Sequence, residues 1–203
     1  MALSTSQMLS QSITVLTQPR IETFEQLQGT GTKQDGLRYV IAAAIVSAVA
    51  AIVFGLLFMF FSSRGFLGVI GGGLAAFILP IVGYYVFAFL VYTVGKSQGG
   101  ADAEDAVFYA IALYTAPLLA LNGIVGSIPL LNCLAAPLLL VLGLYQIYLT
   151  YLATRASMNL ESTPAIITIV VAWVVELIVF AILGGIFAAL GLGAAAAGGL
   201  LGG

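Results

Sequence analysis

Charged residues divide the chain into long uncharged stretches, and these stretches are the main structural signal. No charged residue occurs in 39–63, 65–95 or 106–154, and 162–203 contains only Glu176. A helix needs about 20 predominantly apolar residues to cross a hydrocarbon core of roughly 30 Å. We therefore expect membrane-spanning helices within these stretches and polar connections between them.

The lengths of the stretches predict an all-α bundle of five spanning helices. The first and last stretches hold one helix each. The second holds one after a break at Gly71–Gly73, and the third holds a hairpin whose turn falls within 122–129, where Asn, Gly, Ser and Pro concentrate. The predicted spans are 38–61, 74–94, 105–122, 130–152 and 165–190, followed by a Gly/Ala-rich tail over 191–203.

The polar segment 1–36 carries two short apolar stripes at helical spacing. The first stripe is Leu9, Ile13 and Leu16, and the second, after Pro19, is Ile21, Phe24 and Leu27. This pattern predicts two short amphipathic helices on the cytoplasmic surface of the membrane. A partly ordered tail is the alternative.

The composition supports an integral membrane protein and excludes several function classes. The chain is 62% hydrophobic and 7% charged, whereas soluble domains carry roughly a quarter charged residues. A net charge of -2 without a basic cluster argues against nucleic-acid binding. The chain has no histidine and a single cysteine, Cys133, so common catalytic and metal-binding sets are missing. We expect no catalytic residue, cofactor or metal.

Lysine and arginine predict the orientation in the membrane. Five of the six lie before the first span or after the second and fourth, namely Arg20, Lys33, Arg38, Lys96 and Arg155; the sixth is Arg64. Because cytoplasmic loops carry an excess of these residues, the N-terminus is expected in the cytoplasm and the C-terminus outside.

Several short motifs, taken in their order and spacing, resemble the Yip-domain family of five-span membrane proteins. They are Val15-Leu-Thr-Gln-Pro19 with Phe24 and Leu27, Gly99-Gly100, Tyr114-Thr-Ala-Pro117, Ile128-Pro129 and Tyr145-Gln-Ile-Tyr148-Leu. The resemblance covers roughly 15–183. It implies a cytoplasmic N-terminus and a role in membrane trafficking or membrane homeostasis.

The resemblance is to the short prokaryotic members of that family. Eukaryotic members are similar to secretory-pathway adaptors that bind prenylated Rab GTPases through a longer hydrophilic N-terminal region. About three dozen residues precede the first span here, so Rab binding is not carried over. The resemblance favours a bacterial or archaeal cytoplasmic membrane and leaves an endomembrane open.

Glu176 is the main candidate for intramembrane chemistry. It follows Pro164 by twelve residues, or about 18 Å along a helix, near the middle of the bilayer. Gln146 and Tyr114 each lie nine residues from a charged residue at the cytoplasmic face, so the three residues are expected to share a polar layer. The layer is either a proton or solute site, or a protonated carboxyl hydrogen-bonded between helices.

Two further features have mainly structural interpretations. Asp102, Glu104 and Asp105 form an acidic cluster that lacks the spacing of a cation-binding loop, and we expect Asp102 to cap the third spanning helix. Prolines within three spans, Pro80, Pro117 and Pro137, are expected to kink their helices.

Two functions remain open. The first is a non-enzymatic protein that organises membrane or recruits lipids or an unidentified membrane or cytoplasmic protein. Its contact surface would be Ile21, Phe24 and Leu27 together with the cytoplasmic loop around 96–105. The second is a small transporter, channel or lipid-moving protein that uses the layer around Glu176. A homo-oligomer is compatible with both.

Overall fold

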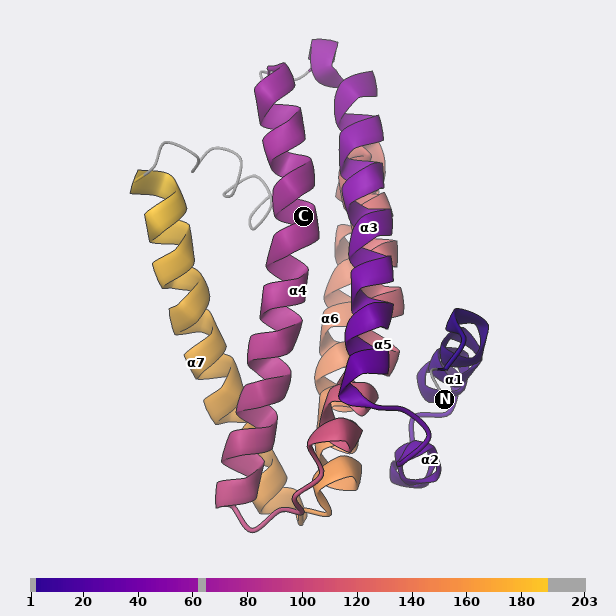
Figure 1. The fold of residues 1–203 in the computed structure, drawn as a ribbon. Helices are drawn as coiled ribbons and strands as arrows, with labels where there is room; N and C mark the ends of the chain where they lie inside the picture. The colour runs from indigo at the N-terminus through magenta and orange to yellow at the C-terminus, as the bar shows by residue number, and fades with distance from the viewer. Residues whose placement is uncertain (1–2, 62–64, 190–203) are drawn as a thin grey trace.

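The computed structural model describes residues 3–61 and 65–189, over which the chain is helical and contains no strand. The helices are α1 (Thr5–Thr17), α2 (Ile21–Leu27), α3 (Lys33–Leu57), α4 (Phe66–Ser97), α5 (Glu104–Ser127), α6 (Pro129–Met158) and α7 (Ser162–Ala189), with a short 3-10 helix, η1 (Met59–Phe61), after α3. The five long helices form a bundle, and α1 and α2 lie beside it near the start of α3 (Figure 1). Arg64 and the tail 191–203 lie outside the described residues.

Five helices, α3 to α7, are long and apolar enough to cross a membrane within the described part of the chain. The predicted all-α, five-span architecture is confirmed. The chain is an integral membrane protein.

The predicted break at Gly71–Gly73 is wrong, because α4 continues through all three glycines from Phe66 to Ser97. A spanning helix satisfies its own backbone hydrogen bonds, and a break inside the hydrocarbon would leave some of them unpaired. Gly73 is buried against α3, where a Cβ would overlap the side chain of Ile52. This glycine therefore allows two helices to approach closely.

The turn of the α5–α6 hairpin is also shorter than predicted. α5 extends to Ser127 and α6 begins at Pro129, so Ile128 alone separates them. The hydroxyl of Ser127 donates a hydrogen bond to the Gly123 carbonyl at 2.5 Å, which accommodates this polar residue in the last helical turn. Proline suits the first position of α6, because that position needs no N–H donor.

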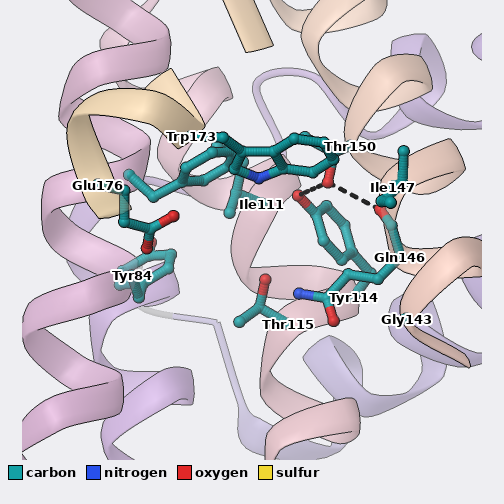
Figure 2. A pocket seen from close by; sticks show the side chains of 11 residues that line it. Tyr84, Ile111, Tyr114, Thr115, Gly143, Gln146, Ile147, Thr150, Trp173 and Glu176 are labelled. Carbon is teal, nitrogen blue, oxygen red and sulfur yellow. Dashed lines mark hydrogen bonds between the residues drawn. The ribbon is translucent and has the colours of Figure 1, made fainter. Parts of the chain in front are cut away.

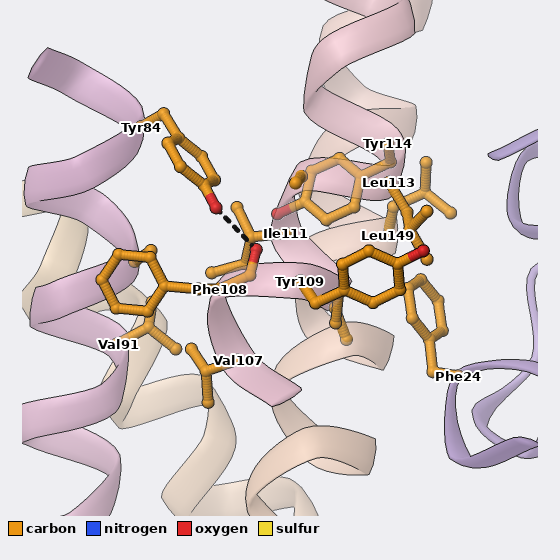
Figure 3. Packing of buried hydrophobic residues seen from close by; sticks show 14 of the residues in the cluster. Phe24, Tyr84, Val91, Val107, Phe108, Tyr109, Ile111, Leu113, Tyr114 and Leu149 are labelled. Carbon is orange, nitrogen blue, oxygen red and sulfur yellow. Dashed lines mark hydrogen bonds between the residues drawn. The ribbon is translucent and has the colours of Figure 1, made fainter. Parts of the chain in front are cut away.

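α5 is the central helix of the bundle, in contact with α1, α3, α4 and α6. Buried side chains line most of its first three turns, including Phe108, Tyr109 and Tyr114. Tyr84 of α4 donates a hydrogen bond to the Phe108 carbonyl at 2.8 Å, and Phe24 of α2 reaches the same core (Figure 3). The helices around α5 thus share a single core.

The acidic cluster links helix ends, and the predicted cap at Asp102 is wrong. The residue at the cap position of α5 is Ala103, which makes no side-chain capping bond. Asp102 instead accepts hydrogen bonds from Lys96 Nζ at 2.7 Å and from the Tyr92 hydroxyl. The hydrogen bond from Lys96 and, to a smaller extent, the one from Tyr92 hold the pKa of the exposed Asp102 carboxyl below its usual range.

The other two members of the cluster join α5 to the start of α3. Glu104 pairs with Lys33 Nζ at 2.6 Å, and Asp105 accepts the backbone N–H of Lys33 at 2.8 Å. A carboxylate in the first turn also complements the positive end of its own helix. These contacts bring the first residues of α3 and α5 together at one end of the bundle. This end carries Lys33, Lys96 and Arg155, and we call it the charged end.

Candidate intramembrane binding site

A cavity of about 170 Å³ lies between α4, α5, α6 and α7. Side chains from all four helices point into it (Figure 2). The residues that line it are Tyr84 and Phe87 of α4, Ile111, Tyr114 and Thr115 of α5, Gly143, Gln146, Ile147 and Thr150 of α6, and Trp173 and Glu176 of α7. All three residues of the predicted polar layer, Tyr114, Gln146 and Glu176, are among them.

The cavity lies deep within the spans. Tyr114 is ten residues from the end of α5 at the charged end, Gln146 is twelve from the corresponding end of α6, and Glu176 is fourteen from the start of α7. At 1.5 Å per residue these offsets are about 15 to 21 Å. With a hydrocarbon core of roughly 30 Å, these offsets place the three residues near the middle of the membrane.

Hydroxyl groups on one side of the cavity form a short hydrogen-bond chain. The Thr150 hydroxyl donates to the backbone carbonyl of Gln146 at 2.8 Å, and the oxygens of Tyr114 and Thr150 are 2.9 Å apart. Because the single hydroxyl hydrogen of Thr150 is used by the carbonyl, Tyr114 is the donor in the second bond. The Tyr114 oxygen can therefore accept a hydrogen bond, and the Thr115 hydroxyl is a neighbouring donor.

Glu176 faces the cavity from α7 without a protein donor. Its carboxyl lies next to α4 at Gly83, where a Cβ would be 3.6 Å from Oε1 of Glu176 and 2.9 Å from the Phe180 ring. Among the described residues, none makes a hydrogen bond or an ion pair with this carboxyl. An ionisable group at this depth is costly unless it finds a partner.

The rest of the lining is uncharged and includes several aromatic rings, and one side is open. Trp173 lies beside Glu176, and Tyr84 lies near the carboxyl (Figure 2). Gly143 is exposed and Ile147 is 42% exposed, so the cavity reaches the outer surface of the bundle along α6. At mid-membrane depth this surface contacts lipid, so the opening is lateral.

Thr150, Trp173 and Thr115 are site residues that sequence reasoning missed. Helical spacing contains a signal for two of them, since Thr150 follows Gln146 by four positions and Trp173 precedes Glu176 by three. Thr115 adjoins Tyr114, and adjacent positions do not share a helix face, so spacing gives no signal for it. Spacing gives no signal for Gly83 or Gly143. A glycine contributes to the cavity by leaving space between helices, and this effect depends on how the helices pack.

The second N-terminal stripe does not form the outward contact surface that was predicted. Phe24 is 2% exposed and belongs to the core of the bundle, and Ile21 and Leu27 are half-buried against that core. α2 packs on α6, and the Gln28 side chain donates to the Ala156 carbonyl at 2.5 Å. The expectation was wrong because a short amphipathic helix can bury its apolar face against its own protein as well as against lipid.

α1 is also docked on the bundle, through a face other than the apolar stripe that was predicted to lie on the membrane. Its buried residues are Met8, Ser12 and Val15, while Leu9 and Ile13 are 50% and 54% exposed. Polar contacts hold it in place. Ser12 donates to the Tyr39 hydroxyl at 3.1 Å, Tyr145 donates to the Leu16 carbonyl at 2.7 Å, and Tyr109 bonds Gln11.

The three intramembrane prolines lie inside continuous helices. Pro80 is within α4, Pro117 within α5 and Pro137 within α6. None interrupts its helix, and the kinks remain a prediction. None of the three lines the cavity.

The Yip1 domain family matches the chain over residues 13–198. The chain belongs to this family. The Yip1 domain begins within α1 and includes α2 and all five spanning helices, so the cavity and the docked N-terminal helices both lie inside it. Membership confirms the resemblance seen in the short motifs. No curated protein and no solved structure gives a match to the chain.

Proposed function

We propose that this Yip1 domain protein is a non-enzymatic membrane protein that binds the polar group of a small solute or lipid inside the membrane, as a step in moving it. The observation that carries the proposal is the Glu176 carboxyl, which faces a lateral cavity and has no donor among the described residues. A ligand that supplies the missing donor would offset the cost of placing this group in the membrane.

The position of the cavity supports movement as well as binding. It lies near mid-membrane, about equally far from both surfaces, and it opens toward lipid beside Gly143. We place the charged end, with the N-terminal helices, in the cytoplasm because it carries Lys33, Lys96 and Arg155. A ligand entering from the lipid would meet Glu176 without crossing a layer of charged residues.

The test is transbilayer movement of phospholipids labelled on an acyl chain, with intact headgroups, in proteoliposomes. We expect wild-type protein to accelerate movement over protein-free vesicles. Glu176→Gln, which keeps the shape of the side chain and removes its charge, should lower the rate, as should Gly143→Phe, which narrows the cavity opening. Leu177→Ala is the matched control, because Leu177 adjoins Glu176 on α7 but is 71% exposed on the outer surface. Equal rates in wild-type and protein-free vesicles would refute the proposal.

A second function, organisation of the membrane itself, is favoured by the outward face of α1. Leu9 and Ile13 remain exposed although α1 is docked on the bundle. α1 packs beside the membrane-spanning helices α5 and α6, so its exposed side chains Leu9 and Ile13 are placed to enter the cytoplasmic leaflet. Recruitment of lipids or of a protein partner would use this face instead of Ile21, Phe24 and Leu27.

A further inference from the structure

The donor and acceptor pattern of the cavity restricts the chemistry of its ligand. The polar groups of the lining include the Glu176 carboxyl, the Tyr114 oxygen and the Gln146 amide. The first is an acceptor when ionised, the second has spent its hydrogen on Thr150, and the third offers both a donor and an acceptor. The Thr115 hydroxyl and the Trp173 indole N–H add donors to the lining, but neither bonds the Glu176 carboxyl. A ligand that binds this carboxyl must therefore bring a donor of its own.

The charge of the lining adds a second restriction. Glu176 is the single ionisable acid or base among the described lining residues apart from the tyrosine hydroxyls, and no lysine or arginine is among them. A carboxylate in a water-poor site attracts a cation more strongly than it would in water. The site would repel an anion such as a free phosphate, for which it offers no positive group.

The aromatic lining also suits a cation. Trp173 and Tyr84 lie on either side of the Glu176 carboxyl in Figure 2. The face of an aromatic ring attracts a positive group, and tryptophan does so most strongly. The Tyr84 hydroxyl is already bonded to the Phe108 carbonyl, so this tyrosine contributes its ring and not a competing donor.

We infer that the cavity binds a primary ammonium group, which places its N–H donors on Glu176, Tyr114 and Gln146. The volume of about 170 Å³ accommodates a small headgroup and not the acyl chains of a lipid, which would remain outside through the opening beside Gly143 and Ile147. The group belongs either to an aminophospholipid or to a small free amine. The inference rests on the proposed function, because it names the ligand class of the same site.

The only tryptophan of the chain, Trp173, lines the cavity and reports its occupancy directly. The full-length protein in phosphatidylcholine nanodiscs is titrated with ethanolamine and with choline, and Trp173 fluorescence is followed. We expect a saturable change with ethanolamine. Choline has a positive charge but no N–H donor, so its response should be weaker. Glu176→Gln should weaken the ethanolamine response by roughly tenfold or more, whereas Leu177→Ala should match wild type.

A second experiment, with a lipid in place of free ethanolamine, identifies the source of the ammonium group. Nanodiscs containing phosphatidylethanolamine should change Trp173 emission relative to phosphatidylcholine alone if the ligand is a lipid. A response to free ethanolamine only would assign a soluble amine. If Glu176→Gln fails to fold, Gly143→Phe keeps the carboxyl and should abolish the response by narrowing the opening.

Three results would overturn the inference. They are no response to either ammonium source, equal responses to choline and ethanolamine, and an undiminished response in Glu176→Gln. Lipid movement that persists for phosphatidylglycerol at the same rate as for phosphatidylethanolamine would overturn the ammonium assignment alone. Absence of all lipid movement together with a normal ethanolamine response would instead refute movement as the function.

Discussion

Ser47 and Gly123 form the closest approach of α3 to α5. The Ser47 hydroxyl donates to the Leu119 carbonyl at 3.1 Å, and a Cβ placed on Gly123 would overlap the Ser47 side chain. Without a hydrophobic driving force between helices in lipid, such close backbone approach and interhelical hydrogen bonds stabilise the pair. This contact anchors the far end of the central helix.

Gly123→Leu should therefore destabilise the bundle. The added side chain must push α3 and α5 apart, and overpacking of this kind costs about 1–3 kcal/mol. The thermal midpoint in detergent should fall. The matched control is Gly72→Leu on α4, where a Cβ meets no atom within 4 Å. An equal fall in both variants would show that α3 and α5 do not depend on this contact.

The residues of the polar layer could be predicted from sequence, and the cavity around them could not. Glu176 is recognisable because it is the only charge in 162–203, and its depth follows from the helical rise. Whether Tyr114 and Gln146 face it depends on the rotation of three helices about their axes. That rotation is set by packing contacts such as Phe180 on Gly83, which involve residues nearly one hundred positions apart.

At the scale of elements, α1 has two usable faces. Met8 and Val15 are 3% and 0% exposed against the bundle, while Leu9 and Ile13 are about half-exposed. A helix that is apolar on both sides can be held by the protein on one side and by acyl chains on the other. Sequence periodicity predicted one apolar stripe, Leu9, Ile13 and Leu16, on the membrane surface and did not predict the second face, which packs against the protein.

Replacing Leu9 and Ile13 together by serine should release α1 from the lipid without undocking it from α5. Each apolar side chain contributes about 1.5–3 kcal/mol when fully buried. Since Leu9 and Ile13 are each about half-exposed, roughly half of that contribution should be lost for each. If α1 organises membrane, vesicles reconstituted with wild type should be smaller than those with the double variant. Gln26→Ser, an exposed polar change on α2, is the control. Identical vesicle diameters would remove this function from α1.

The number of spans was predictable because it depends only on the length and composition of uncharged stretches. Helix ends were less predictable. Glycines at 71–73 and polar residues at 122–127 are typical of breaks in soluble proteins, yet here both segments are helical. In lipid the backbone has no water to bond, so the helix persists through residues that would end it elsewhere.

At the scale of the whole molecule, the bundle has one charged end, whereas the described residues at its other end are uncharged; Arg64 lies outside the described residues. Lys33, Lys96 and Arg155 lie at helix ends that meet at the charged end, where the Ala101 N–H donates to the Met158 carbonyl at 2.8 Å and joins two loops. Phe60, 87% exposed, lies at the opposite end, after α3. This asymmetry predicts that the protein takes a single orientation in the membrane.

Single cysteines test that orientation in a Cys133→Ala background, since Cys133 is the only native cysteine. A membrane-impermeant maleimide should label Phe60→Cys in intact cells. It should label Ser97→Cys and Glu161→Cys, which are exposed at the charged end, only after permeabilisation. The reverse pattern would place the charged end outside and would contradict the rule that lysine and arginine favour the cytoplasm.

The docking of α1 has a consequence for how the protein is made. Its partners are distant along the chain, since Gln11 bonds Tyr109 across 98 positions and Leu16 bonds Tyr145 across 129. At a synthesis rate of roughly 5–20 residues per second, the first helix waits on the order of ten seconds for the last of these partners. α1 thus reaches its docked position only after most of α6 has been made, although it is itself synthesised well before both of these partners.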